Sequence, residues 1–122
     1  MPKKKKPLSP IQLGDFREEA FRDLRISQGM LSFKRNRPSF AKQRKGNNSP
    51  DMWGLFDICS MNEHVVEFAQ VKGHDTRDEQ KLIKIWLAKN HGKIPNNVRC
   101  IVAYHRPELK DQWRIVVIRE AN

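Results

Sequence analysis

Apolar residues along the chain follow two spacings, one typical of helices and one typical of strands. From residue 14 to about residue 27 they recur every three or four positions, which predicts an amphipathic helix. A second helix is expected after a turn at residues 73–78, with Asp75 or Thr76 as its N-cap and a stop at residues 90–92. The defining apolar residues are Leu13, Phe16, Ala20, Phe21 and Leu24 in the first helix, and Leu82, Ile83, Ile85, Trp86 and Leu87 in the second.

Five short apolar runs have the length and composition of strands. We expect an edge strand at residues 30–33, a hairpin formed by residues 53–60 and 65–72, and a final pair at residues 98–104 and 112–119. The order is then helix, three strands, helix, two strands. This mixture excludes the all-α and all-β classes and predicts an α/β fold, a mixed β-sheet flanked by helices.

A chain of 122 residues is long enough for one hydrophobic core, so we expect one domain over residues 13–122. Residues 1–12 are predicted to be a flexible basic arm, because a lysine run among prolines cannot form a packed core. Residues 34–50 are basic and rich in Pro, Gly, Asn and Ser, which predicts a long loop.

The net charge of +10 is concentrated in the first part of the chain, where residues 1–49 hold thirteen Lys and Arg against four acids. Such clustering is typical of proteins that bind nucleic acid, although ribosomal proteins and proteins that bind anionic membranes share it. We predict phosphate contacts from the arm and from the acid-free segment 34–45; the alternatives are a solvated tail and a solvated linker. The predicted DNA contacts are Lys3, Lys4, Lys5, Lys6, Lys34, Arg35, Arg37, Lys42, Arg44 and Lys45.

The sequence has no run of about eighteen apolar residues and no charged-then-apolar leader. We therefore expect an intracellular protein, cytoplasmic or nucleoid-associated, or in the host cytoplasm if viral. Cys59 and Cys100 both lie in apolar runs, which predicts buried, reduced thiols and argues against a zinc site.

Polar residues interrupt the predicted hairpin. Asp57 lies in the apolar run LFDIC, where a carboxylate is costly unless it is paired, hydrogen-bonded or bound to a cation. On a strand, Gln70 and Lys72 face one side and Glu67 faces the other. Two interpretations remain open. Asp57 and Lys72 form an ordinary ion pair, or these residues hold a divalent metal against a phosphate.

The pattern Gly14-x-x-x-Glu18, then Phe56–Asp57, then Gln70–Val71–Lys72 resembles the PD-(D/E)XK nuclease superfamily. It is most similar to the archaeal-type Holliday junction resolvases, in which an acid on the first helix precedes an aspartate at a strand end and an E-x-K triplet. The thirteen-residue step from Asp57 to Gln70 and the element order agree with that family over roughly residues 13–120. Phe56 replaces the motif's proline, and Gln70 replaces the usual acid, a Q-x-K variant as in Mrr-like restriction nucleases.

The resemblance implies a restriction-endonuclease-like core and Mg²⁺-dependent phosphodiester hydrolysis, with Mn²⁺ as a substitute. The implied metal ligands are Asp57, the Gln70 amide oxygen, the Val71 carbonyl and Glu18, with Glu19 a less well spaced alternative to Glu18. The implied catalytic residues are Glu18, Asp57, Gln70 and Lys72, and Lys72 would orient or acidify the attacking water. Because glutamine carries no negative charge, weaker metal binding is expected.

These implications point to a structure-selective DNA endonuclease, a Holliday junction resolvase of recombination and repair that acts as a homodimer. The alternatives are a restriction- or repair-type nuclease of the same fold on duplex or flap DNA, and a non-catalytic basic protein that binds nucleic acid. Residues 29–33 and the last helix are both candidates for the dimer surface. Trp53 and Trp113 are candidates for stacking on bases, although aromatic residues that flank strands are more often core.

Overall fold

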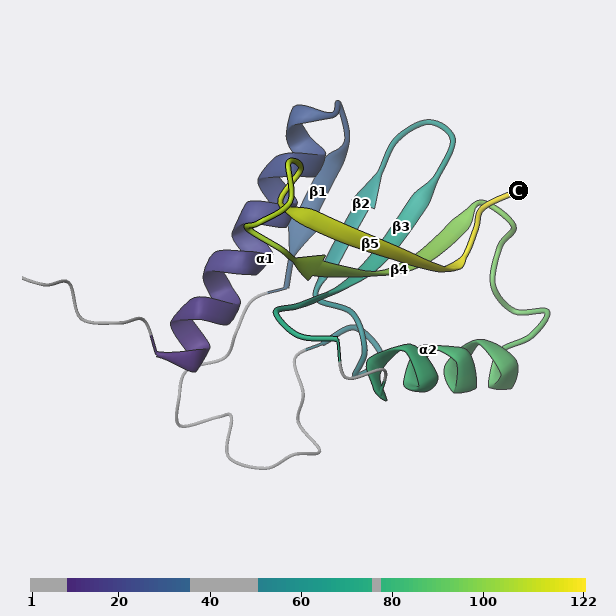
Figure 1. The fold of residues 1–122 in the computed structure, drawn as a ribbon. Helices are drawn as coiled ribbons and strands as arrows, with labels where there is room; N and C mark the ends of the chain where they lie inside the picture. Colours follow the sequence, from purple (N-terminus) through teal and green to yellow (C-terminus); the bar gives the residue numbers. More distant parts are fainter. Residues whose placement is uncertain (1–8, 36–50, 76–77) are drawn as a thin grey trace, which may run out of the picture.

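A five-stranded sheet with one helix against each face is the centre of the computed structural model, which describes residues 9–35, 51–75 and 78–122 (Figure 1). The elements are α1 (Pro10–Ser27), β1 (Leu31–Lys34), β2 (Ile58–Met61), β3 (Val66–Lys72), α2 (Asp78–Lys89), β4 (Val98–His105) and β5 (Trp113–Arg119). The predicted α/β class and the predicted order of elements are confirmed. That the sheet is the core of a nuclease stays a prediction.

The sheet has the strand order β1-β2-β3-β4-β5 and is mixed, as predicted. Neighbouring strands are antiparallel except β3 and β4, which run parallel and pair Gln70 with Val102 and Lys72 with Tyr104. Parallel neighbours need a crossover connection, and α2 lies within it.

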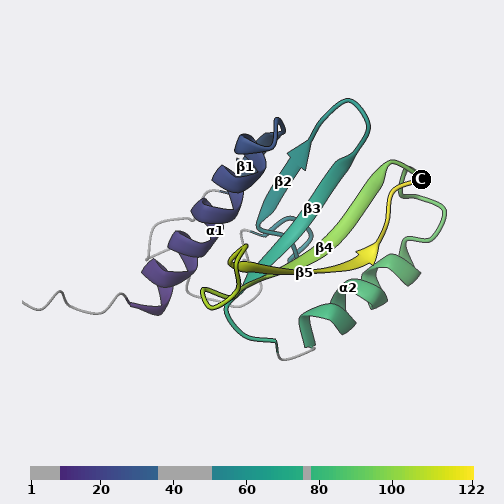
Figure 2. The ribbon, with the colours of Figure 1, turned by 45° about the horizontal axis from the view of Figure 1, so that its top comes forward.

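The sheet buries a separate hydrophobic cluster on each face, and Figure 2 shows the sheet between the two helices. Because side chains alternate along a strand, Ala69 and Val71 of β3 face α1, whereas Phe68, Gln70 and Lys72 face the opposite side. The cluster under α1 contains Phe21, Ile58, Ala69, Val71, Ile101 and Ala103. The cluster under α2 contains Leu55, Phe56, Ile83, Val98, Cys100, Val102 and Tyr104.

Helix α1 begins at Pro10, four residues before the predicted start. The Ser9 hydroxyl accepts a hydrogen bond from the Gln12 backbone N–H at 3.2 Å, and the Gln12 side chain accepts one from the Ser9 N–H at 3.0 Å. This capping box, with proline at the first helical position, is a strong start signal. Residues 10–12, which we assigned to the arm, are therefore the first turn of α1.

The buried face of α1 also differs from the predicted apolar stripe. Phe16 is 52 % exposed, and the buried residues are Glu18, Phe21 and Arg25. Arg25 donates from Nε and Nη2 to the two carboxylate oxygens of Glu67, each at 2.9 Å. Two of the three buried residues are thus charged, because each has a buried partner of opposite sign, Arg35 for Glu18 and Glu67 for Arg25.

The strand predicted at residues 53–60 is shorter than expected, since β2 covers only Ile58–Met61. A tight loop precedes it, closed by a bridge between Met52 and Phe56. Trp53 and Gly54 have φ values of 54° and 71°, a left-handed conformation that cannot continue a strand. The other strands and α2 lie within three residues of their predicted bounds. Thr76, one of the two N-cap candidates, lies outside the described residues.

Cys59 and Cys100 are free, as predicted. Cys100 is fully buried, and burial raises the pKa of its thiol to about 11, whereas Cys59 is only half-buried. Neither α1 nor α2, the two helices in the described residues, has the length and apolar composition to cross a membrane.

Candidate active site

A pocket of about 290 Å³ lies at the end of β3. Its walls come from the first half of α1, the residue after β1, the loop that precedes β2, and the last residues of β3. The lining residues are Gly14, Arg17, Glu18, Arg35, Asp51, Asp57, Gln70, Val71, Lys72 and Gly73. The structure therefore brings all five site residues predicted from the sequence to one pocket: Glu18, Asp57, Gln70, Val71 and Lys72.

Asp57 is held firmly at the base of this pocket. Its backbone N–H donates to the Ala69 carbonyl at 2.8 Å, which ties it to β3. Its carboxylate accepts the Val71 N–H on Oδ2 at 3.0 Å and the Arg35 Nε–H on Oδ1 at 3.1 Å. The cation next to this buried carboxylate is therefore Arg35, and not Lys72 as in the simple ion-pair interpretation.

Arg35 lies among three carboxylates. Besides Asp57, it forms an ion pair with Asp51, and its Nη2 lies 3.4 Å from Oε2 of Glu18. Its guanidinium is buried, so the prediction that Arg35 contacts DNA from an exposed loop is wrong. Three acids therefore lie close together around this one guanidinium.

The closeness of these acids affects the titration of Asp57. Burial, followed by the nearby negative charges of Asp51 and Glu18, raises the pKa of Asp57 from 3.8 to about 7. The hydrogen bond from the Val71 N–H acts in the opposite direction but does not compensate. Such a carboxyl either keeps a proton near neutral pH or gains from a further cation in the pocket.

Gln70 lines the same pocket from the neighbouring strand. Its side chain is buried, and its Oε1 has no hydrogen-bond partner among the described residues. A buried acceptor without a donor is unfavourable by about 1–3 kcal/mol. Gln70 Oε1 therefore favours a ligand that supplies a positive charge or a hydrogen bond.

The rim of the pocket is basic. Lys72 is exposed, and Arg17 packs so closely on Gly73 that a Cβ at that position would lie 2.4 Å from Arg17 Cζ. Arg106 Nη1 donates to the Gly73 carbonyl at 3.0 Å. Carboxylates at the base and cations at the rim are the arrangement needed to hold a metal ion below a phosphate.

Three acids or bases next to these residues have other partners. Glu19 is exposed, and its Oε1 lies 3.9 Å from Lys34 Nζ. Glu18, and not Glu19, lines the pocket, so Glu18 is the acid of α1 that belongs to the site. Lys34 lies in β1, with its Nζ also 3.4 Å from Asp15 Oδ1, which corrects its predicted place in a DNA-binding loop. Glu67 faces away from the pocket and binds Arg25, as its position on β3 predicted.

The other predicted DNA contacts lie outside the described residues; they are Lys3, Lys4, Lys5, Lys6, Arg37, Lys42, Arg44 and Lys45.

Sequence reasoning missed Asp51, Arg17 and the buried role of Arg35. The sequence held one indication of Asp51, because it is the first acid after the basic segment and lies six residues before Asp57.

Over residues 9–35, 51–75 and 78–122, no three His, Cys, Asp or Glu side chains are arranged to hold a metal ion by themselves. The residues nevertheless fit a hard cation in their chemistry, since Asp57 and Gln70 Oε1 are oxygen donors that still favour positive charge.

Comparisons of the chain with models of protein families, with curated proteins and with solved structures gave no significant match.

Proposed function

We propose that the chain is a Mg²⁺-dependent DNA endonuclease whose pocket at the end of β3 hydrolyses a phosphodiester bond. The observation that carries the proposal is the pair formed by Asp57, with its raised pKa, and the unpartnered Gln70 Oε1 in one pocket. Both groups favour a cation. The basic rim above them suits a phosphate, and the resemblance to the PD-(D/E)XK superfamily supports the same reading.

Asp57, Gln70 Oε1 and the Val71 carbonyl would hold the metal, with Glu18 contributing directly or through water. When bound, Mg²⁺ or Mn²⁺ lowers the pKa of a coordinated water and offsets charge on the phosphate. Asp57 would hold the cation as an ionised carboxylate.

The remaining pocket residues bind and orient. Lys72 and Arg17 lie at the rim, where their charges hold the scissile phosphate over the carboxylates. Lys72 also orients the attacking water. Arg35 keeps Glu18, Asp51 and Asp57 close together despite their repulsion.

Branched DNA is the proposed substrate, and a homodimer is the proposed active form, because symmetric cutting of a four-way junction needs two sites. Leu31 and Phe33 of the edge strand β1 are 74 % and 57 % exposed and lie on one face of the strand. They support the dimer surface predicted at residues 29–33. Leu82 and Ile85 of α2 are each 53 % exposed, so α2 remains the other candidate surface.

A non-catalytic role in nucleic-acid binding is the second candidate. It is favoured by Arg35, whose guanidinium already lies among the three carboxylates, and by Gln70 in place of an acid. Such a protein would need no metal.

A cleavage assay on four-way junction, flap and linear duplex DNA with Mg²⁺ or Mn²⁺ tests the proposal. We expect metal-dependent cutting of the branched substrate that is lost in Asp57→Ala and Lys72→Ala. Glu18→Ala should reduce cutting strongly. Its matched control, Glu19→Ala on the exposed side of the same helix turn, should not. Gln70→Glu should retain or increase activity.

Cutting that survives Asp57→Ala or Lys72→Ala would refute the assignment of the site. Junction binding without cutting in either metal would establish the non-catalytic alternative. Equal cutting of linear duplex and junction would instead favour a restriction- or repair-type nuclease.

A further inference from the structure

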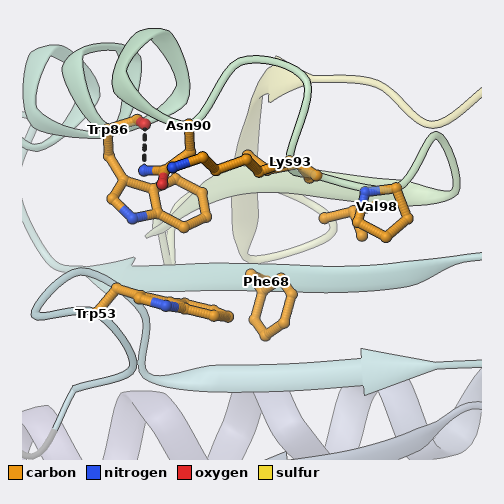
Figure 3. A pocket seen from close by; sticks show the side chains of 8 residues that line it. Trp53, Phe68, Trp86, Asn90, Lys93 and Val98 are labelled. Atoms are coloured by element: carbon orange, nitrogen blue, oxygen red, sulfur yellow. Dashed lines mark hydrogen bonds between the residues drawn. The ribbon is translucent and has the colours of Figure 1, made fainter.

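A second pocket, of about 190 Å³, lies between the C-terminal end of α2 and the middle of β3. Trp53 and Phe68 form one wall, and Trp86, Asn90 and Lys93 lie across the gap from them (Figure 3). The volume is below the roughly 300–1,000 Å³ of pockets for drug-sized ligands, so it suits a single ring system.

The walls of this pocket present flat aromatic surfaces. The Trp53 ring centroid lies 5.0 Å from that of Phe68 and 5.1 Å from that of Trp86, so the three rings support one another. Trp53 remains 60 % exposed although it packs on two partly buried rings, those of Phe68 and Trp86. A large aromatic side chain with a supported ring and an open face is suited to stacking on another flat ring.

Polar groups complete the pocket. Asn90 Nδ2 donates to the Trp86 carbonyl at 2.8 Å, which fixes the amide and leaves its oxygen as an acceptor at the pocket (Figure 3). The Lys93 side chain extends along the same wall toward Asn90 (Figure 3). An aromatic face, an amide and an ammonium are the groups with which proteins bind an unstacked base and its phosphate.

The position of the pocket links it to the candidate active site. Phe68 lines the aromatic pocket, and Gln70, two residues further along the same face of β3, lines the acidic one. Two residues of a strand span about 7 Å. The loop before β2 likewise supplies Trp53 to one pocket and both Asp51 and Asp57 to the other.

We propose that the aromatic pocket binds an unstacked nucleobase of the DNA strand whose phosphate lies at the acidic pocket. This inference rests on the proposed function and narrows its substrate to DNA with an unpaired nucleotide beside the cleaved bond. A net charge of +10 and the ammonium at the pocket favour a nucleic-acid occupant over an apolar surface of a second copy.

The test measures base-dependent binding in a metal-free buffer with EDTA, so that it does not depend on cleavage. Fluorescence anisotropy compares an oligothymidylate with a strand of equal length in which the central nucleotides are abasic. Both strands carry the same phosphates, so any difference reports the bases. We expect the wild type to bind the base-bearing strand at least about tenfold more tightly.

Trp53→Leu keeps apolar volume but removes the aromatic face, and it should abolish this preference. The matched control is Ile26→Ala, which removes a similarly exposed apolar side chain of α1 that does not line the pocket. Thermal denaturation of both variants separates loss of the ring from loss of the fold. A measurement that needs no variant is photo-crosslinking of a strand with one 5-iodouracil, which we expect to join Trp53 or Trp86.

Equal affinity of the wild type for both strands would overturn the proposal, as would a crosslink confined to Trp113 near α1. Dissociation of a dimer by Trp53→Leu, with base preference unchanged, would assign the pocket to a second copy and would also overturn it. If base preference is found but no metal supports cutting, the base pocket stands and the nuclease proposal fails.

Discussion

Replacing Asp57 by asparagine is expected to change how the stability of the fold depends on pH. The pKa of Asp57 is about 7 in the folded chain against 3.8 in an unfolded one, because burial and two neighbouring acids oppose its charge. Between these values the folded state binds more protons than the unfolded state. This carboxyl therefore contributes its full stabilisation below about pH 4, and that stabilisation is lost as the pH rises toward 7. Asparagine has no titrating proton and removes the effect.

The size of the effect follows from the difference between the two pKa values. One pKa unit corresponds to about 1.4 kcal/mol, and about two units separate pH 5 from the folded pKa. Raising the pH from 5 to 8 should thus lower the free energy of unfolding through Asp57 alone by about 3 kcal/mol. Glu18 and Asp51 share the same environment, so this is the largest value that the single group contributes.

Urea denaturation of both proteins at pH 5 and pH 8, in EDTA, measures the difference. Titration of groups away from this pocket affects the two proteins equally, so subtracting the pH dependence of Asp57→Asn isolates the contribution of Asp57 and of the acids coupled to it, Glu18 and Asp51. Under the proposed function, Mg²⁺ should recover stability at pH 8 in the wild type only. Equal pH dependence in the two proteins, or a wild type that gains more stability than Asp57→Asn on going to pH 8, would refute the reasoning.

Three further substitutions test other parts of the structure. Gly73→Ala should displace the flexible Arg17 side chain, leave stability within about 1 kcal/mol, and lower the slope of log affinity against log salt by about 1 in DNA titrations. Arg25→Met should reduce the free energy of unfolding in urea by about 3–5 kcal/mol, since it leaves Glu67 buried without its bidentate partner; a change below 1 kcal/mol would contradict this. Ser9→Ala should reduce it by about 1 kcal/mol through loss of the N-cap, and an unchanged urea midpoint would show that α1 starts later in solution.

The sequence predicted the class of fold and the order of elements because the periods of apolar residues differ between helix and strand. The prediction from apolar spacing failed where buried positions carry charged side chains. The inward face of α1 could not be identified from apolar spacing, since Glu18 and Arg25 are buried by partners that lie far along the chain. The loop before β2 has the apolar composition of a strand, but the left-handed conformations of Trp53 and Gly54 and the backbone hydrogen bonds of a tight turn replace the strand there.

The candidate site was predictable as far as it depends on spacing within neighbouring elements. The positions of Asp57, Gln70 and Lys72 follow from strand alternation in one hairpin, and the structure lines one pocket with all three. Asp51 and Arg35 could not be predicted, because their ion pair joins residues sixteen positions apart in the sequence, which no local spacing indicates. In a basic segment, an arginine whose carboxylate partners are unknown is interpreted as an exposed contact to DNA, which is why the burial of Arg35 was not expected.

The two buried ion pairs of α1 have opposite polarity. Near the middle of the helix an acid, Glu18, meets the basic Arg35, and two turns later a base, Arg25, meets the acidic Glu67. Seven residues of helix separate the two pairs by about 10 Å. A helix docked in the reverse direction would place acid against acid and base against base. The two ion pairs therefore select one orientation of α1 on the sheet. Exchanging the two charges within one pair alone would leave matched charges in either direction of the helix, whereas exchanging them within both pairs would again match only the present direction.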